Sequence, residues 1–400
     1  MLESPAFAST MLRELRGEYV KKGWSENMRD EIALTIKPLM SCNMRCRHCF
    51  NGDDLNISNV LPVESACRFL EIARKDYDKI KVTFHGGEPT LASMDFYKTF
   101  YALEREMLEH GATFYNFFTT NGYKLSEELA DLLINNNTMI NVSFDGPYNH
   151  VLRTHTETVY RNIMMLQEKG ARLRIFCTVC EESYRHLEEI YEWFRARELD
   201  FKILPIEPRG YAAENKQLIM NPEEFTAELV RVYRLWARDT TSRIKVYTFQ
   251  EFANLKAGIQ FKPYWFNYEI ALNPDGKIYP FGRPHDVHFC LGTPEETDHI
   301  TECFTRPEYA RMLAIIDTYR NSLADFCGKC PSFHICRGTS ICSSFVYGDN
   351  RESLKYSCRL SDNIFREVLG ANAEIRADID AGNSRQYNAY IVSHLAEHSA

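Results

Sequence analysis

Three cysteines near the start of the chain are spaced as ligands of a metal centre. Cys42, Cys46 and Cys49 have three and then two residues between them, and they follow the alternating run 33–36, which predicts a β-strand. Cysteine thiolates hold four-iron clusters, and three ligands leave one iron open, as in catalytic metal sites. The alternative is a zinc site with a distant fourth ligand. Because zinc ligands usually come in two pairs, three in one loop favour iron.

A second group of cysteines lies towards the other end of the sequence. Cys327, Cys330, Cys336, Cys342 and Cys358 fall within one stretch that opens with a C-x2-C pair. This clustering is a strong signal for a metal site, and zinc as well as iron fits the spacing. Metal binding is therefore the main expected use of the thirteen cysteines, because intracellular proteins rarely form disulfides.

The segment 85–89, His-Gly-Gly-Glu-Pro, follows the second predicted strand. Gly86 and Gly87 allow backbone to approach a ligand closely, and Glu88 offers a carboxylate to an ammonium group. A plain turn at the strand end is the alternative. The position of the segment, one strand after the three-cysteine loop, favours a ligand site.

An α/β fold is expected to position these residues. Strand-like and helix-like runs alternate in units of roughly 30 residues, which implies parallel strands with right-handed crossovers. The predicted strands are 33–36, 81–84, 114–119, 140–144, 173–179 and 201–205, and the predicted helices are 62–75, 93–110, 126–135, 156–169, 184–197 and 222–238. Sites in barrels of parallel strands lie on loops at the C-terminal strand ends, where both segments above fall. Further on, a Pro-Asp-Gly turn predicts a hairpin within 272–281.

The composition indicates an ordinary globular protein. The 400 residues allow two to three domains, and the hydrophobic share is 44%. Neither a membrane-spanning apolar run nor a signal peptide is recognisable, so a cytoplasmic protein without membrane contact is expected. With a net charge of −8 and no basic stripe, nucleic acid is not an expected partner.

The loop 42–49 resembles the C-x3-C-x-Φ-C motif of radical S-adenosylmethionine (SAM) enzymes, with His48 in the aromatic position. Segment 86–89 resembles the GGEP motif of that family, which holds the amino group of SAM. The resemblance implies that the six strands form the partial (β/α)6 TIM-like barrel of radical SAM enzymes. It also implies that the three cysteines hold the SAM-binding 4Fe-4S cluster.

Two further strand ends resemble segments that lie near the ribose and carboxylate of SAM in this family. They are Thr120-Asn121-Gly122, like TNG, and 143–147, like SxDG with Asp145 as a structural residue; plain turns are the alternative. Where relatives read His-Asp-x-x-Arg, Val151 replaces the acid, and Arg153 is either a bidentate partner of the SAM carboxylate or a solvated side chain. The residues thus assigned to SAM are His48, Gly86, Gly87, Glu88, Asn121, Ser143 and Arg153.

The C-terminal cysteines resemble the SPASM domain, the cysteine-rich extension of peptide-modifying radical SAM enzymes. Its full pattern, C-x(9–15)-G-x4-C, then C-x2-C-x5-C-x3-C and a last C, builds two auxiliary 4Fe-4S clusters. In this chain Phe281 and Ser340 replace two of those cysteines, and no cysteine lies between Cys180 and Cys290. All three missing ligands belong to one cluster.

A reduced, twitch-like version of this domain with one auxiliary 4Fe-4S cluster is therefore expected. The resemblance assigns that cluster to Cys327, Cys330, Cys336 and Cys358. A partial second site that uses Cys342, Cys290 or Cys303 is the alternative. The predicted division of the chain is an N-terminal arm 1–31, the radical SAM barrel 32–240, the SPASM- or twitch-like domain 241–360 and a helical tail 361–400.

The function that the resemblance implies is reductive cleavage of SAM to a 5′-deoxyadenosyl radical, which abstracts hydrogen from a substrate. The expected substrate is a ribosomally made peptide that is oxidised or cross-linked, with a flavodoxin or ferredoxin as electron donor. The alternatives are a small-molecule dehydrogenase of the amino-sugar type, a sulfatase-maturing enzyme and a zinc-bearing binding protein. Sulfatase maturation is less expected, because those relatives keep both auxiliary clusters. Brown colour would indicate iron, whereas a zinc protein is colourless.

Overall fold

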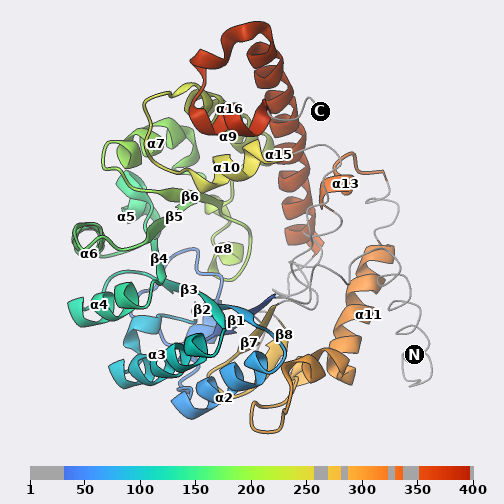
Figure 1. The fold of residues 1–400 in the computed structure, drawn as a ribbon. Coiled ribbons are helices and arrows are strands. Elements are labelled where there is room, and N and C mark those ends of the chain that lie inside the picture. The colour runs from blue at the N-terminus through green and yellow to red at the C-terminus, as the bar shows by residue number, and fades with distance from the viewer. Residues whose placement is uncertain (1–30, 256–268, 281–286, 323–328, 337–350, 397–400) are drawn as a thin grey trace.

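One curved sheet organises the chain in the computed structural model (Figure 1), which describes residues 31–255, 269–280, 287–322, 329–336 and 351–396. The first seven strands along the chain are parallel, and β8 is antiparallel to β7. In order across the sheet, the strands are β6 (Phe201–Pro205), β5 (Leu173–Val179), β4 (Met139–Ser143), β3 (Thr113–Thr120), β2 (Lys79–Phe84), β1 (Glu31–Ile36), β7 (Glu269–Leu272) and β8 (Ile278–Pro280).

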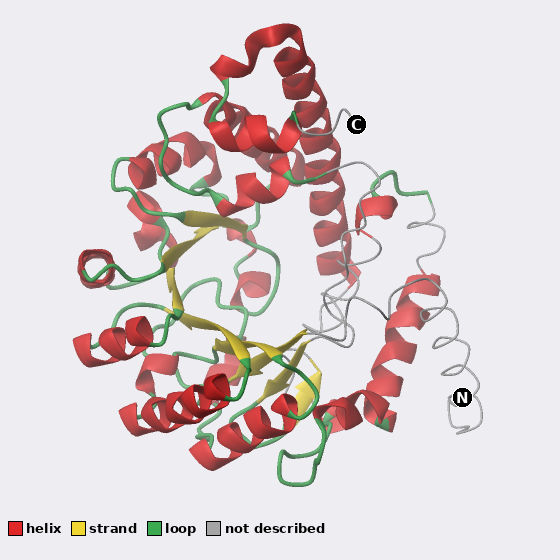
Figure 2. Cartoon of the chain, in the orientation of Figure 1, coloured by secondary structure: helices red, strands yellow, loops and turns green. Residues whose placement is uncertain are grey.

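Figure 2 shows most of the helices along the outer side of this curved sheet. Several begin at a side-chain cap: Ser93, Ser126 and Asn221 each accept a hydrogen bond from a backbone N–H in the first helical turn. The helices are α2 (Val63–Arg74), α3 (Met94–Glu109), α4 (Glu127–Asn135), α5 (Asn149–Leu152), α6 (Thr156–Glu168), α7 (Leu187–Arg195), α8 (Tyr211–Glu214), α9 (Pro222–Arg238), α10 (Tyr247–Ala253), α11 (Pro307–Ser322), α13 (Phe333–Cys336), α15 (Arg351–Asp378) and α16 (Ala389–Leu395).

The six predicted strands and the helices between them are confirmed, and so is the hairpin, formed by β7 and β8. The sequence did not predict which strand of the sheet this hairpin pairs with. Strand β7 pairs in parallel with β1, in the register Ala33 with Glu269 through Ile36 with Leu272. It thereby covers the edge that β1 would otherwise expose, since an uncovered strand leaves unpaired backbone groups.

The predicted domain limits stay a prediction, and elements of the structure cross two of them. The sheet continues across residue 240, because β7 and β8 extend it. Residue 360 falls inside helix α15, which runs unbroken from Arg351 to Asp378 and packs against α9 of the barrel. The predicted N-terminal arm 1–31 lies outside the described residues, apart from the first residue of β1.

The two faces of the sheet differ because side chains alternate along each strand. In β2, Val82 and Phe84 are fully buried, and Phe84 contacts the aromatic rings of Tyr97 and Phe100 on α3 with centroids 5.3 and 5.1 Å away. The opposite face, which carries Thr83, is only partly buried. A parallel sheet covered by helices on both faces would be buried throughout. The partly buried face of this sheet is therefore available for a site.

Glu104 is a buried acid at the packing surface between α3 and β3. Its Oε2 accepts a hydrogen bond of 2.7 Å from Asn116 Nδ2. Glu104 Oε1 and Asn116 Oδ1 have no hydrogen-bond partner among the described residues. Burial raises the pKa of Glu104 to about 8, although the bond from Asn116 works in the opposite direction.

Glu104 should make the stability of the fold depend on pH. The folded chain keeps a proton that the unfolded chain loses above its ordinary pKa of about 4.3. Stability is therefore full below that pKa and falls as the pH rises towards 8, by at most about 1.4 kcal/mol per pH unit. Glu104→Gln should remove this loss, as read from thermal unfolding near pH 6 and pH 9.

Glu109→Gln is the matched control, because Glu109 is exposed at the end of the same helix. It should keep the pH dependence of the unchanged chain. Equal pH dependence in Glu104→Gln and the unchanged chain would show that Glu104 is ionised in the fold.

Candidate active site

The three-cysteine loop lies at the C-terminal end of β1. Cys42, Cys46 and Cys49 are all partly exposed, and the loop turns tightly where Cys49 N donates to Cys46 O at 3.1 Å. The thiols are close enough to interact electrostatically, Cys46 with both of the others. Burial raises the pKa of Cys42 to about 11 and raises that of Cys46.

Gly86 and Gly87 are required by chain packing. A Cβ on Gly86 would lie 2.2 Å from Leu39 O, and one on Gly87 would lie 1.9 Å from Met40 O. Gly86 also has a φ of +124°, a conformation that favours glycine. The two glycines thus bring the loop after β2 against the residues that lead into the cysteine loop. Their direct contact with SAM stays a prediction.

Glu88 is buried and ties the end of β2 to the end of β3. Its Oε1 accepts hydrogen bonds from Thr90 N at 3.0 Å and Thr120 Oγ1 at 2.6 Å, and its Oε2 accepts one from Asn121 N at 2.7 Å. Burial raises the pKa of Glu88, and these donors act in the opposite direction. The sequence did not predict Thr120 as a partner, although its place in the Thr-Asn-Gly segment at a strand end was a usable signal.

Asn121 connects this network to the cysteine loop. Its Nδ2 donates to Asn43 Oδ1 at 2.7 Å and lies 3.5 Å from Cys42 Sγ, while its Oδ1 accepts from Tyr123 N. Asn43 Nδ2 is buried and has no hydrogen-bond partner among the described residues. Ser143, the last residue of β4, is partly buried at the same edge of the sheet. For both predicted residues, contact with SAM stays a prediction.

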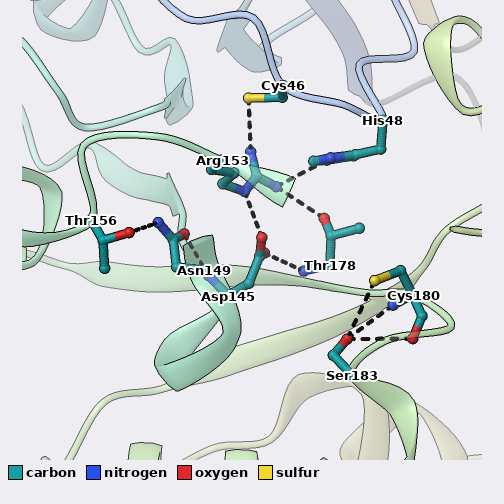
Figure 3. Close-up of polar contacts among 9 residues, drawn as sticks. All are labelled: Cys46, His48, Asp145, Asn149, Arg153, Thr156, Thr178, Cys180 and Ser183. Carbon is teal, nitrogen blue, oxygen red and sulfur yellow. Dashed lines mark hydrogen bonds and ion pairs between the residues drawn. The ribbon is translucent and has the colours of Figure 1, made fainter. Parts of the chain in front are cut away.

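Arg153 forms the other side of the site (Figure 3). Its Nε donates to Asp145 Oδ2 at 2.9 Å, and its Nη2 contacts Thr178 Oγ1 at 3.0 Å and His48 Nε2 at 3.2 Å. Its Nη1 lies 4.0 Å from Cys46 Sγ. These contacts use four of the five guanidinium N–H groups. The bidentate contact with SAM that the sequence suggests stays a prediction, and forming it requires breaking one of these contacts.

Asp145 has the structural role expected from the sequence. It is 1% exposed, and its Oδ1 accepts a 2.7 Å hydrogen bond from Thr178 N, which ties the end of β4 to β5. His48 accepts from Arg153 through Nε2, so its proton is on Nδ1. Nδ1 is buried without a partner among the described residues. Burial and the Arg153 charge hold the pKa of His48 well below its usual range.

The C-terminal cysteines gather where α13 meets α15. Cys330 Sγ donates to Asp362 Oδ1 of α15 at 3.6 Å, and Cys330 interacts electrostatically with Cys336 on α13. Cys358 precedes Asp362 by one helical turn and therefore lies on the same face of α15. Cys327, Ser340, Cys342 and Phe281 lie outside the described residues, so the structure tests neither the fourth ligand nor the missing ones.

The donor sets suit iron–sulfur clusters. Among the described residues, no three or more Cys, His, Asp or Glu side chains converge on a position for a single metal ion. A cluster does not need that convergence, because each cysteine binds a different iron. At the cysteine loop, the unpartnered polar atoms of Asn43 and His48 are groups that a bound cofactor would satisfy.

Comparison with known proteins agrees with this geometry. Residues 36–194, from the end of β1 into α7, match the Radical SAM superfamily. Residues 36–194 form a radical SAM domain.

Relatives of this radical SAM protein extend over most of its length. It is 23% identical over 361 residues to a cysteine-type anaerobic sulfatase-maturating enzyme of Clostridium perfringens, covering 84% of this chain and 95% of the relative. The solved structure of native anSMEcpe with bound AdoMet and Cp18Cys peptide is 20% identical, with a TM-score of 0.71 over 87% of this chain and 99% of that one.

A second solved structure is Streptococcus suis SuiB bound to precursor peptide SuiA. It is 16% identical, with a TM-score of 0.53 over 77% of this chain and 72% of that one. At these identities, the likeness to both structures shows the fold. Separately, none of the helices in the described ranges has the length and apolar character to cross a membrane.

Proposed function

We propose that this chain is a radical SAM enzyme that oxidatively modifies a peptide. The observation that carries the proposal is the convergence of three strand ends on one loop: Cys42, Cys46 and Cys49 lie beside the Glu88–Asn121 network and beside Arg153. In this proposal the three cysteines would hold a 4Fe-4S cluster. When bound, such a cluster supplies the electron that splits SAM into methionine and a 5′-deoxyadenosyl radical, which removes hydrogen from the substrate.

The residues of this chain contribute order and shape. Glu88 fixes the turn that presents Asn121, and Asn121 orients both Asn43 and Cys42 through its amide nitrogen. Because these side chains are held by several hydrogen bonds each, they need little rearrangement to receive a ligand. His48 Nδ1–H and Asn43 Nδ2–H have no partner among the described residues, so both are available to polar groups of SAM.

Cys327, Cys330, Cys336 and Cys358 would hold one auxiliary 4Fe-4S cluster, which suits a net oxidation because the substrate must lose a second electron. Cys330 and Cys336 interact with each other, and Cys330 contacts α15, which carries Cys358. A flavodoxin or ferredoxin is the proposed source of the first electron.

Two substrates are supported. A ribosomally made precursor peptide fits the predicted single auxiliary cluster, and SuiB, which shares this fold, was solved with a precursor peptide. Sulfatase maturation is favoured by relatives that match most of the chain and carry that name. The reconstituted protein should be offered, in separate anaerobic assays, a peptide encoded beside its gene, cysteine and serine peptides of sulfatase type, and an amino sugar. The product masses distinguish these functions.

Glu88→Gln should weaken SAM binding by about 1.5–3 kcal/mol, the range for hydrogen bonds to charged groups. All three groups around the carboxylate are donors, so the amide nitrogen of glutamine would face one of them and displace it. The affinity for SAM can be measured by anaerobic calorimetry after reconstitution.

Glu157→Gln is the control, since Glu157 is exposed in the first turn of α6. It should bind SAM as the unchanged chain does. Unchanged affinity in Glu88→Gln would mean that segment 86–89 is a turn without a part in SAM binding.

A further inference from the structure

Arg153 lies between a carboxylate and the cysteine loop. Its side chain is 9% exposed and that of Asp145 is 2% exposed, so both charges are buried. Nε of the guanidinium faces Asp145, whereas Nη1 and Nη2 face Cys46 and His48 of the cysteine loop. Figure 3 shows Asp145 and Cys46 on opposite sides of the guanidinium. The positive end of this ion pair therefore points at the loop.

The surroundings keep that charge in place. Asp145 Oδ1 accepts a hydrogen bond from Thr178 N, and the backbone N–H of Asp145 donates to Asn149 Oδ1 at 3.1 Å. Asn149 in turn donates to Thr156 Oγ1 at 2.9 Å. A backbone hydrogen bond also ties the cysteine loop to the segment that carries Arg153, since Arg47 N donates to Leu152 O at 3.1 Å. The guanidinium cannot turn away from Cys46 without breaking this network.

Few other charges face Arg153. Asp145 is its ion-pair partner among the described residues, and Cys46 and Cys177 are the thiols that interact with it. Arg47 and Glu182 form an ion pair at 3.3 Å, but both side chains are more than two-fifths exposed and are screened by water. Arg153 is thus the charged group with the largest effect at Cys46, and Cys49 and Asp145, which lies beyond the guanidinium, oppose it.

Hydrogen bonds to the ligand sulfurs and nearby charge set the reduction potential of an iron–sulfur cluster. A cluster gains negative charge when it is reduced, so a fixed cation beside one of its thiolates favours the reduced form. We propose that Arg153 is a positioning residue that holds a positive charge against Cys46 and so raises the reduction potential of the cluster. This inference rests on the proposed function, which assigns a cluster to Cys42, Cys46 and Cys49.

Three variants separate charge from packing. Arg153→Lys keeps the charge, Arg153→Gln removes it, and the double variant Arg153→Gln/Asp145→Asn removes both members of the pair. The double variant matters because a lone buried carboxylate can prevent folding. Arg195→Gln is the matched control, since Arg195 pairs with Asp239 at 2.6 Å on the outer helices.

The measurement is a dithionite titration of the anaerobically reconstituted full chain, followed by electron paramagnetic resonance in the absence of SAM. SAM added afterwards identifies the signal of the catalytic cluster, because that signal changes. At a fixed potential, Arg153→Gln should lower the ratio of reduced to oxidised cluster at least tenfold, a shift of about 59 mV for one electron. The double variant should shift less in the same direction, and Arg153→Lys and Arg195→Gln should stay near the unchanged chain.

A wild-type potential in both charge-removing variants would overturn the inference, even if SAM cleavage falls in them, since Arg153 would then act on SAM or on packing alone. If the unchanged chain holds no cluster that responds to SAM, the proposed function itself fails. The two failures are therefore distinguishable.

Discussion

Replacing Cys42, Cys46 and Cys49 together by alanine is expected to abolish the release of 5′-deoxyadenosine from SAM. The thiolates are the groups that attach a cluster to the chain, and the network of Glu88, Asn121 and Arg153 cannot substitute for them, because its side chains are already hydrogen-bonded to one another and to the backbone. The iron at the C-terminal cysteines should remain, since Cys330 and Cys336 lie at α13 and α15, on separate elements. Chromatography of the anaerobic reaction and iron analysis of the variant measure both results.

Cys67→Ala is the control for the loss of a cysteine as such. Cys67 is a partly buried thiol on α2, outside both groups of cysteines, and the variant should cleave SAM as the unchanged chain does. SAM cleavage by the triple variant would place the catalytic cluster elsewhere.

The second large effect concerns the number of clusters. We expect two per chain, or about eight irons after anaerobic reconstitution, because cysteines are absent at several ligand positions of one SPASM cluster and thiolates are what hold it. Cys330→Ala should lower the content to about four irons, whereas Cys342→Ala should leave it nearly unchanged. Iron and sulfide analysis, together with Mössbauer spectra, give these numbers.

A content near twelve irons that falls in Cys342→Ala or Cys290→Ala would contradict this expectation. It would show that a third cluster has been rebuilt with new ligands. Electrons from the substrate would then have a second relay to pass through.

The barrel could be predicted because its signals are local. Strand and helix patterns alternate along residues 33–238, and the parallel order follows from the crossovers. The pairing of β7 with β1 could not be predicted in the same way. More than 200 residues separate the two strands, and the pattern of a hairpin is the same whether or not one of its strands joins a larger sheet.

The functional site shows the same difference between local signals, which the sequence contains, and long-range contacts, which it does not. The positions of Cys42, Cys46 and Cys49 follow from a strand end, but most partners of Glu88 and Arg153 come from other strands and depend on the folded arrangement. For Gly86 and Gly87, the sequence indicates a close approach to a ligand. The structure shows a close approach to Leu39 and Met40, because a residue type records that space is needed but not what fills it.

In the proposed function, this chain couples SAM cleavage to hydrogen abstraction from a peptide. The most direct test uses a substrate peptide deuterated at its carbon-bound positions, in an anaerobic reaction with SAM, reductant and the reconstituted chain. We expect deuterium in the released 5′-deoxyadenosine and a mass change in the peptide, and we expect neither from the variant that lacks Cys42, Cys46 and Cys49. Unlabelled 5′-deoxyadenosine with an unchanged peptide, for the neighbouring-gene peptide and for the cysteine and serine peptides alike, would contradict it.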